Sequence, residues 1–248
     1  RTVPSLTELI SDQKKLSDIQ ELSIDDILPG ARISNAGVFE ASSKTFFISG
    51  AGGSIGAEIT RQLLVANPKK IILYEFSEFN LFQIERECLA IVDSKDLDTL
   101  IIPILGDIRD INNLNNVFIR FQVDHIYHAA AYKHVPLVED ENNLAIAAEN
   151  NILGTYNLAK VAVNNNVKSF VMISTDKAVR PTNIMGATKR FAEIIIQSIN
   201  ASTDGTRLSM VRFGNVINSS GSVIPLFLDQ ISQGGPVTVT DKNVMRYF

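Results

Sequence analysis

From Thr45 onward, short apolar runs alternate with longer stretches in which apolar residues recur at helical spacing. Runs that are apolar almost throughout are typical of strands covered on both faces, and their alternation with helix-length stretches favours β-α-β units. The predicted strands are Thr45–Ser49, Lys70–Glu75, Leu100–Leu105, His125–His128, Ser169–Ser174 and Leu208–Arg212. The predicted helices are Ser54–Ala66, Glu78–Ile91, Ile111–Phe121, Leu144–Asn164 and Ala187–Ser202. The pattern therefore predicts an α/β fold with a doubly wound parallel sheet.

The same pattern divides the chain into three parts. Residues 1–44 are predicted to be an N-terminal extension with apolar residues at roughly helical spacing, which either docks on the main domain or serves as a partner-binding arm. Residues 45–212 form the predicted main domain. In residues 213–248 the alternation weakens into sequence rich in Gly, Ser and Pro, which indicates the start of a small, truncated substrate-binding lobe. We therefore interpret the chain as part of a longer protein.

Composition and charge narrow the class of protein. Of the 248 residues, 45% are hydrophobic and 20% are charged, which is enough apolar material for a sizeable core. The formal net charge of -4 argues against a nucleic-acid partner, which would show as clustered Lys and Arg. With one cysteine, Cys88, no intrachain disulfide can form, and no run approaches the roughly 18 apolar residues that span a membrane. We expect a cytoplasmic protein with no membrane contact within this stretch.

Three glycines follow the first predicted strand, in the segment Gly50-Ala-Gly-Gly-Ser-Ile-Gly56. Between a strand and a helix, Gly50 permits a tight turn, Gly53 lets the backbone approach a pyrophosphate, and Gly56 allows the helix to pack closely on the strand. Ser54 and Ile55 begin the helix, whose N-terminus supplies partial positive charge at the same point. The spacing predicts a Rossmann dinucleotide-binding domain over residues 45–212. The alternative is a tight turn that binds no ligand.

Residues after the next strands bear on the choice of dinucleotide. Glu75, about 20 residues beyond the glycine turn, is placed to accept hydrogen bonds from the adenosine ribose and to repel a 2′-phosphate. This favours NAD over NADP, although Ser77 or a lysine could shift the preference. Asp107, before Ile108, has two interpretations that stay open here: it caps the following helix, or it reaches the adenine amino group. The small side chains of Ala129-Ala130-Ala131 would let the backbone approach a flat cofactor ring.

Two further segments carry a family resemblance. Ser174-Thr-Asp-Lys-Ala178 ends the fifth predicted strand, and Met185-Gly-Ala-Thr-Lys189 opens the next helix. With the glycine turn, these segments resemble the extended short-chain dehydrogenase/reductases, whose pattern is Ser or Thr followed by Tyr-x-x-x-Lys. Ser77-Glu-Phe, the segment 129–136 and Arg212-Phe-Gly-Asn-Val216 make the chain similar to the bacterial UDP-N-acetylglucosamine 4,6-dehydratases, most of all to the membrane-anchored, configuration-retaining branch of this polysaccharide biosynthesis family. The resemblance covers nearly all of residues 45–248.

The resemblance implies an internal redox reaction that makes a UDP-4-keto-6-deoxy sugar for glycan or glycoprotein biosynthesis. Hydride passes from C4 of the sugar to NAD, water leaves from C6, and hydride returns to C6, so the cofactor is not consumed. Met185 occupies the position of the catalytic tyrosine and cannot transfer a proton, a replacement that the anchored branch shares. The implied lyase therefore needs other groups for its proton transfers.

The resemblance points to the end of the fifth strand for these groups. Our hypothesis makes Asp176 the acid toward the C6 hydroxyl and Lys177 the base at C5, while Thr175 holds the C4 oxygen. The group that first accepts the C4 proton is left open. Lys189 is expected to orient the nicotinamide ribose, and burial or a nearby cation is expected to lower the pKa of Lys177.

Further residues are assigned to the sugar nucleotide. The matching motifs suggest Lys133 and Asn215 as substrate contacts, and the guanidinium of Arg246 suits the UDP diphosphate. His128 and His134 are interpreted as structural, and no metal site is predicted, because too few His, Cys or paired carboxylates cluster. We expect a homo-oligomer and, for the full-length protein, the cytoplasmic face of the inner membrane. Two alternatives stay open: an NAD-dependent nucleotide-sugar 4-epimerase, and a non-catalytic NAD-binding regulatory module.

Overall fold

The computed structural model describes residues 41–216, 219, 223–239, 241 and 243. The chain divides into two compact units, and the larger one contains every described residue from Ala41 to Ser219. The smaller unit contributes helix α10 (Val223–Ser232) to the described part. The candidate site described below lies wholly within the larger unit.

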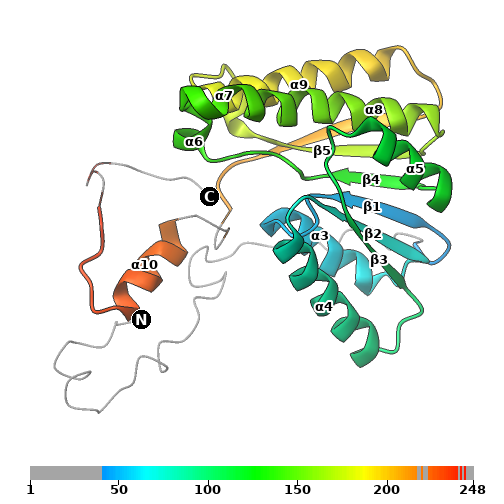
Figure 1. Ribbon diagram of the computed structural model, residues 1–248, viewed down its shortest axis with the longest axis horizontal. Helices are drawn as coiled ribbons and strands as arrows, with labels where there is room; N and C mark the ends of the chain where they lie inside the picture. The colour runs from blue at the N-terminus through cyan, green and yellow to red at the C-terminus, as the bar shows by residue number, and fades with distance from the viewer. Residues whose placement is uncertain (1–40, 217–218, 220–222, 240, 242, 244–248) are drawn as a thin grey trace. The chain divides into compact units, whose positions relative to one another are not determined.

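A six-stranded parallel sheet forms the centre of the larger unit (Figure 1). Its strands are β1 (Thr45–Ser49), β2 (Lys70–Glu75), β3 (Leu100–Leu105), β4 (His125–His128), β5 (Ser169–Thr175) and β6 (Arg207–Phe213), in the spatial order β3-β2-β1-β4-β5-β6. The order reverses between β1 and β4. In open parallel sheets, the crevice outside the carboxyl ends of the strands at such a reversal is where ligands bind.

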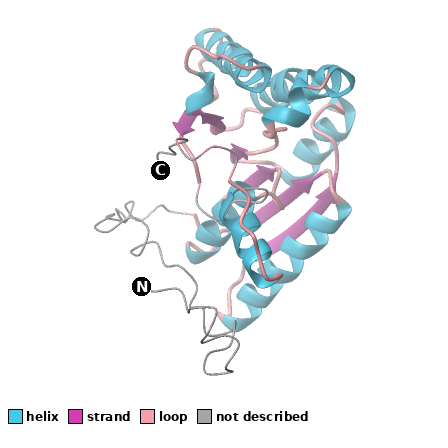
Figure 2. Ribbon diagram, turned by 90° about the vertical axis from the view of Figure 1, so that its left-hand side faces the viewer, coloured by secondary structure: helices cyan, strands magenta, loops and turns pink. Residues whose placement is uncertain are grey.

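Helices cover the sheet on both faces (Figure 1; Figure 2). They are α3 (Ser54–Val65), α4 (Glu78–Ser94), α5 (Ile111–Phe121), α6 (Val135–Glu139), α7 (Glu141–Ala148), α8 (Thr155–Asn164) and α9 (Ile184–Ala201). Side chains of one strand alternate between the faces, so Phe46 and Ile48 pack in a core with α3 and α4, while Phe47 packs in a second core with α5, α8 and α9. The doubly wound α/β fold predicted from the apolar runs is confirmed.

The element ends differ from the prediction by a few residues. The first four strands have the predicted bounds, whereas β5 continues to Thr175 and β6 runs from Arg207 to Phe213. Helix α9 begins at Ile184, because the Asn183 side chain caps it by accepting from the backbone N–H of Gly186 at 2.7 Å. Helix caps and strand pairing determine these ends, whereas the periodicity of apolar residues does not indicate where an element ends.

The predicted single helix Leu144–Asn164 is wrong in detail. It begins earlier, at Glu141, and a π-helical turn over Glu149–Gly154 separates α7 from α8. Two contacts accompany this turn: the Asn151 side chain bonds both the backbone of Tyr132 and the hydroxyl of Thr188, and a Cβ at Gly154 would lie 2.6 Å from the Ile108 side chain. Both contacts join the turn to residues distant in the chain, and π turns are common at functional sites.

The predicted domain bounds stay predictions. Only Ala41–Lys44 of the proposed N-terminal extension belong to the described residues, as do residues 213–216, 219 and parts of 223–243 of the proposed lobe. Among the helices in the part of the chain that the structure describes, none is long and apolar enough to cross a membrane.

Candidate active site

Two neighbouring pockets open at the carboxyl edge of the sheet. The glycine pocket, about 300 Å³, is lined by the glycine turn, the end of β2 and the segment after β3. The lysine pocket, about 230 Å³, is lined by the ends of β5 and β6 and by the start of α9. The residues lining both pockets are Ala129, Ala131 and Tyr132. A ligand as long as a dinucleotide could therefore reach from one pocket into the other.

The glycine turn has the geometry that a pyrophosphate needs. Gly50 has a φ of +67°, and a Cβ there would lie 2.7 Å from the backbone N of Ala130. A Cβ on Gly56 would lie 2.1 Å from the carbonyl oxygen of Gly50, so the close packing of α3 on the turn requires glycine. Helix α3 starts at Ser54, and Gly53 before it makes no side-chain cap hydrogen bond. The partial positive charge of this helix start lies beside the turn, where it favours an anion.

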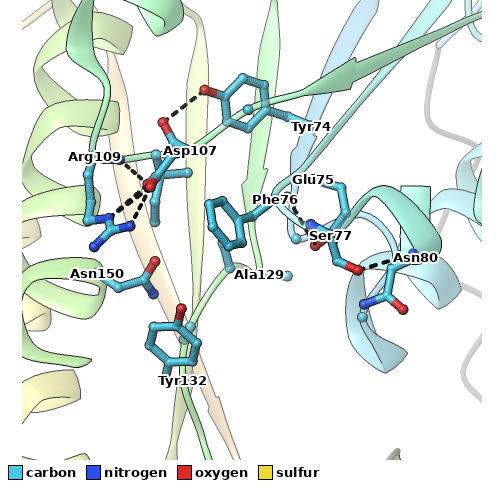
Figure 3. A pocket seen from close by; sticks show the side chains of 16 residues that line it. Tyr74, Glu75, Phe76, Ser77, Asn80, Asp107, Arg109, Ala129, Tyr132 and Asn150 are labelled. Atoms are coloured by element: carbon cyan, nitrogen blue, oxygen red, sulfur yellow. Dashed lines mark hydrogen bonds and ion pairs between the residues drawn. The ribbon is translucent and has the colours of Figure 1, made fainter. Parts of the chain in front are cut away.

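Glu75 is held at the opposite side of the glycine pocket from Asp107 (Figure 3). Its carboxylate is buried, accepting from the backbone N–H of Gly52 at 3.0 Å through Oε2 and from those of Phe76 and Ser77 at 3.1 Å through Oε1. Ser77 lines the pocket and caps α4 by accepting from the N–H of Asn80 at 3.3 Å. The backbone thus fixes the carboxylate at the place predicted for the ribose.

The structure excludes one of the two interpretations of Asp107, because another residue caps α5; the contact with adenine stays a prediction. Asp110 accepts from the N–H groups of Asn112 and Asn113, so the capping interpretation of Asp107 is wrong. Asp107 lines the pocket and is bound by Arg109, whose Nε and Nη2 lie 2.9 and 2.5 Å from Oδ2 (Figure 3). Burial raises the pKa of Asp107, but the bonds from Arg109 outweigh it and lower the pKa. Sequence reasoning missed Arg109, although its position two residues after an aspartate was a usable signal.

Other predicted cofactor residues lie at the two pockets. Ile108 lines the glycine pocket, Ile55 lines the lysine pocket, and Ala129 lines both. Ala130 contacts the glycine turn through its backbone and also lines the glycine pocket. Ser54 is the first residue of α3, next to the pocket-lining Gly53.

Lys189 lies in the lysine pocket with 5% of its surface exposed. Burial lowers the pKa of its ammonium to about 8, and the negative charge of Glu193 offsets part of that fall. None of the described residues forms a hydrogen bond or ion pair with its Nζ. Met185, also 5% exposed, lines the same pocket and packs against Val138 and Ala147, so the tyrosine position holds an apolar side chain.

The segment Thr175–Lys177 forms the rim of the lysine pocket. Thr175 and Lys177 line it, whereas Asp176 does not and has a side chain that is 54% exposed. Asp176 Oδ1 accepts from Thr175 Oγ1 at 2.9 Å and from Lys177 Nζ at 3.2 Å. Burial raises the pKa of Asp176, but these two partners outweigh it and lower the pKa. The lowered pKa favours the carboxylate form of Asp176, which is bonded to Lys177 Nζ.

A buried carboxylate that sequence reasoning missed lies behind this pocket. Glu193, on α9, accepts hydrogen bonds from Ser174, Arg190 and Arg212, and its side chain is fully buried. Burial raises its pKa, but these bonds outweigh it and bring the pKa to about 2. The available signal was its spacing: Glu193 follows Lys189 by one helical turn.

The remaining predicted residues are placed as follows. Lys133 and Asn215 line the lysine pocket, and Arg246 lies outside the described residues. His128 is fully buried, bonded to Ser49 at 2.7 Å and to Thr155 at 2.9 Å, and burial lowers its pKa to about 3. The described residues contain no group of three or more His, Cys, Asp or Glu that could hold a metal ion.

Several known proteins similar to this chain are named for polysaccharide biosynthesis or for reactions of UDP-sugars. Over 255 residues it is 43% identical to the capsular polysaccharide biosynthesis protein CapD of Staphylococcus aureus, with 99% of this chain and 41% of that protein covered. It is 36% identical to the UDP-N-acetylglucosamine 4,6-dehydratase (inverting) of Campylobacter jejuni, with 84% and 60% covered. It is 35% identical to the UDP-glucose 4-epimerase of Rickettsia prowazekii, with 82% and 58% covered. The chain thus spans 41% to 60% of the length of these relatives.

A solved structure and a family match complete the comparison. The X-ray structure of Pen from Bacillus thuringiensis superimposes with a TM-score of 0.73 at 36% identity, covering 82% of this chain and 62% of that chain. Residues 46–248 match the family described as polysaccharide biosynthesis protein. The fold, the dinucleotide turn and these matches agree, and the chain belongs to the polysaccharide biosynthesis protein family.

Proposed function

We propose that this chain forms the NAD-binding and catalytic part of a nucleotide-sugar 4,6-dehydratase that acts on UDP-N-acetylglucosamine. The observation that carries the proposal is the Asp176–Lys177 pair at the rim of a pocket that also holds a buried lysine, Lys189. An acid and a base side by side suit the elimination of water, and the apolar Met185 leaves these polar groups to do the work of a tyrosine. The Campylobacter jejuni relative supports the reaction and the sugar.

The glycine pocket fits NAD. The cradle that a Cβ would fill at Gly50 and the uncapped start of α3 suit a pyrophosphate, and Glu75 lies where a ribose would be read. A solved dTDP-glucose 4,6-dehydratase of Streptomyces venezuelae, 26% identical, contains NAD. When bound, NAD supplies a hydride acceptor for C4 and returns that hydride to C6. We propose that Lys189 orients the nicotinamide ribose and that the buried Glu75 carboxylate gives NAD its preference over NADP, a proposal supported by the position of Lys189 in the lysine pocket and of Glu75 in the glycine pocket.

Asp176 and Lys177 can supply both proton transfers of the elimination. A proton that passes from the Lys177 ammonium to the Asp176 carboxylate, 3.2 Å away, leaves a neutral amine and a neutral carboxyl. Exclusion of water by a bound sugar favours these neutral forms, because burial penalises charge. The amine then takes the C5 proton, and the carboxyl gives its proton to the C6 hydroxyl, which departs as water. The ion pair is thereby restored, with every proton accounted for.

Substrate positioning is assigned to residues around the same pocket. Thr175 is proposed to hold the C4 oxygen, and Lys133 and Asn215, which line the pocket, to contact the sugar nucleotide. Arg246 stays a proposal for the diphosphate. We further propose a homo-oligomer and, for the full-length protein, the cytoplasmic face of the inner membrane.

A 4-epimerase is the second candidate, and one observation favours it: the Rickettsia prowazekii relative carries that name at nearly the same identity. Epimerisation needs oxidation at C4 but no acid at C6, so it leaves the Asp176–Lys177 pair without a task. A regulatory module that only binds NAD leaves the buried cation Lys189 unexplained as well.

Mass spectrometry and proton NMR of the product together distinguish the three functions, because a 4-epimer has the same mass as its substrate. The protein is incubated with UDP-N-acetylglucosamine and NAD, and we expect a product lighter by one water, with no net formation of NADH. A product of unchanged mass but altered stereochemistry would establish the epimerase instead. Binding of NAD without turnover of the sugar would contradict both enzymes and favour the module.

A further inference from the structure

Glu193 joins three segments that border the lysine pocket. Its fully buried carboxylate accepts from Ser174 Oγ on β5 at 2.6 Å, from Arg212 Nε and Nη2 on β6 at 2.7 and 2.6 Å, and from Arg190 Nη1 on its own helix at 3.0 Å. The bidentate contact of Arg212 fixes the plane of the carboxylate. The carboxylate therefore accepts from four donor atoms of three residues. Glu193 does not line the pocket, but its partner Ser174 does.

The partners of Glu193 stand directly before pocket residues. Ser174 itself lines the lysine pocket and precedes Thr175 on β5, and Arg212 precedes Phe213 on β6. The two partners lie side by side in the sheet, in register with each other. Any shift of the carboxylate therefore moves both strand ends at once, together with the two pocket-lining residues that follow them.

Glu193 also affects the charge of Lys189, one helical turn earlier on α9. The titratable groups around Lys189 are Glu193 on its own helix, the neutral His128 on β4, and Lys177 and Lys133 across the pocket. Glu193 is the carboxylate whose charge raises the pKa of Lys189, but its oxygens are taken by serine and arginine donors. The Nζ of Lys189 thus stays available to a ligand, while the negative charge of Glu193 stabilises its ammonium form.

We propose that Glu193 is a positioning residue: through Arg212 and Ser174 it fixes the ends of β5 and β6 that border the lysine pocket, and its charge supports the ammonium of Lys189. The inference rests on the proposed function for its turnover readout alone. Backbone mobility and the titration of Lys189 are measurable whatever reaction the protein catalyses.

Asp124 offers a matched control for a carboxylate whose role is structural. It accepts from the backbone N–H of Thr45 at 2.9 Å and from Lys168 Nζ at 2.8 Å, and it lies directly before β4. It thus ties β1 to the residue before β5 at the amino edge of the same sheet, far along the strands from both pockets. Glu193→Gln and Asp124→Asn each remove one charge and keep the shape of the side chain.

The first experiment follows amide hydrogen exchange in both variants. In Glu193→Gln, we expect faster exchange at residues 175–177 and 213–216 and no change in the glycine turn, because the tie between the strand ends is weakened. Asp124→Asn should leave both segments unchanged. Equal exchange in the two variants at 175–177 and 213–216 would overturn the proposal.

The second experiment separates position from charge. With carbon-13-labelled lysine, the titration midpoint of Lys189 should fall by roughly one pH unit in Glu193→Gln, since a negative charge is lost while two guanidinium groups stay. Arg212→Lys keeps the positive charge but loses the bidentate contact with Glu193. Amide exchange at residues 175–177 and 213–216 should therefore rise, while the titration midpoint of Lys189 stays unchanged. Glu193→Asp should restore the midpoint and only part of the protection. An unchanged midpoint in Glu193→Gln contradicts the charge role.

Turnover gives the third readout. Glu193→Gln should lower kcat by about 10- to 100-fold, as misplaced catalytic groups do, with KM for the sugar and affinity for NAD changed by less than about 3-fold. If Glu193→Gln does not fold, Arg212→Lys, which keeps the charges but loses the bidentate contact outside the pocket lining, should show the same pattern more weakly. A loss that follows only the folded fraction would overturn the proposal. Absence of turnover in the unmodified protein would refute the proposed dehydratase activity. The hydrogen-exchange and titration experiments would still test the role of Glu193.

Discussion

The two pockets are built from different parts of the chain. The glycine pocket owes its shape to backbone: a turn with positive φ, an uncapped helix start and a carboxylate held by three N–H groups. The lysine pocket owes its character to side chains, with a buried ammonium, an exposed ion pair and a carboxylate behind them. A backbone site reads a feature that all dinucleotides share, whereas a side-chain site can be changed to suit one reaction. Substitutions should therefore separate cofactor binding from chemistry.

The largest effect is expected in the lysine pocket. Lys177→Met and Asp176→Asn should each lower kcat by about 100- to 10,000-fold, because each removes one of the two proton-transfer groups. Affinity for NAD should change by less than about 3-fold, which equilibrium titration can check. Near-normal turnover in both variants would show that the pair does not perform the elimination.

The reverse pattern is expected in the glycine pocket. Gly50→Ala should weaken NAD binding by roughly 100-fold, because its Cβ meets the Ala130 backbone and its φ is left-handed. Gly205→Ala is the control, since a Cβ there meets nothing closer than Asn166 Oδ1 at 3.8 Å. Calorimetry should find NAD affinity unchanged in the control. Equal affinity in both variants would mean that the turn does not hold the pyrophosphate.

Glu75→Gln tests whether a side chain adds selectivity to the backbone site. The ratio of NAD affinity to NADP affinity should fall by about 10-fold, because a negative charge no longer faces the 2′-phosphate. Glu78→Gln removes a neighbouring exposed carboxylate of α4 that does not line the pocket. If the two variants change the ratio alike, general charge and not Glu75 sets the preference.

The smallest effect concerns the free energy of unfolding, which the buried charge of Lys189 is expected to lower. Burial lowers its folded pKa to about 8, below the ordinary value of 10.5, so the charged form is penalised at pH 7. Lys189→Met should therefore raise the free energy of unfolding at pH 7 by about 2 kcal/mol, or roughly 4–8 °C in the melting midpoint, while turnover falls. Lys177→Met, whose side chain is 39% exposed, should give no such gain.

The pH dependence of this gain supplies its own check. Between pH 8 and 10.5, the unfolded chain binds more protons at Lys189 than the folded chain, so the unmodified protein gains stability as the pH rises. The advantage of Lys189→Met should shrink across that window and stay constant below it. A gain that is equal at every pH would point to packing in place of charge.

The fold followed from sequence because its signals are local. Apolar runs placed the first four strands at their observed bounds, and the glycine spacing located the turn between β1 and α3. No local signal indicated the π turn that divides the predicted helix Leu144–Asn164. The contacts that accompany this turn, between Gly154 and Ile108 and between Asn151 and Tyr132, join residues distant in the chain. The element ends set by Asn183 and Asp110 could be predicted only by choosing among several polar residues.

The sequence by itself determined the sheet, the glycine turn and the segments that line the two pockets, because strand patterns and glycine spacings act over a few neighbouring residues. Only the tertiary structure decided how those segments interact. It gave the capping of α5 to Asp110 and bound Asp107 to Arg109, and it gathered Ser174, Arg212 and Arg190 on Glu193. Burial and partner choice depend on residues distant in the chain, so the charge of Lys189 and the place of Glu193 emerge only when the strands lie side by side.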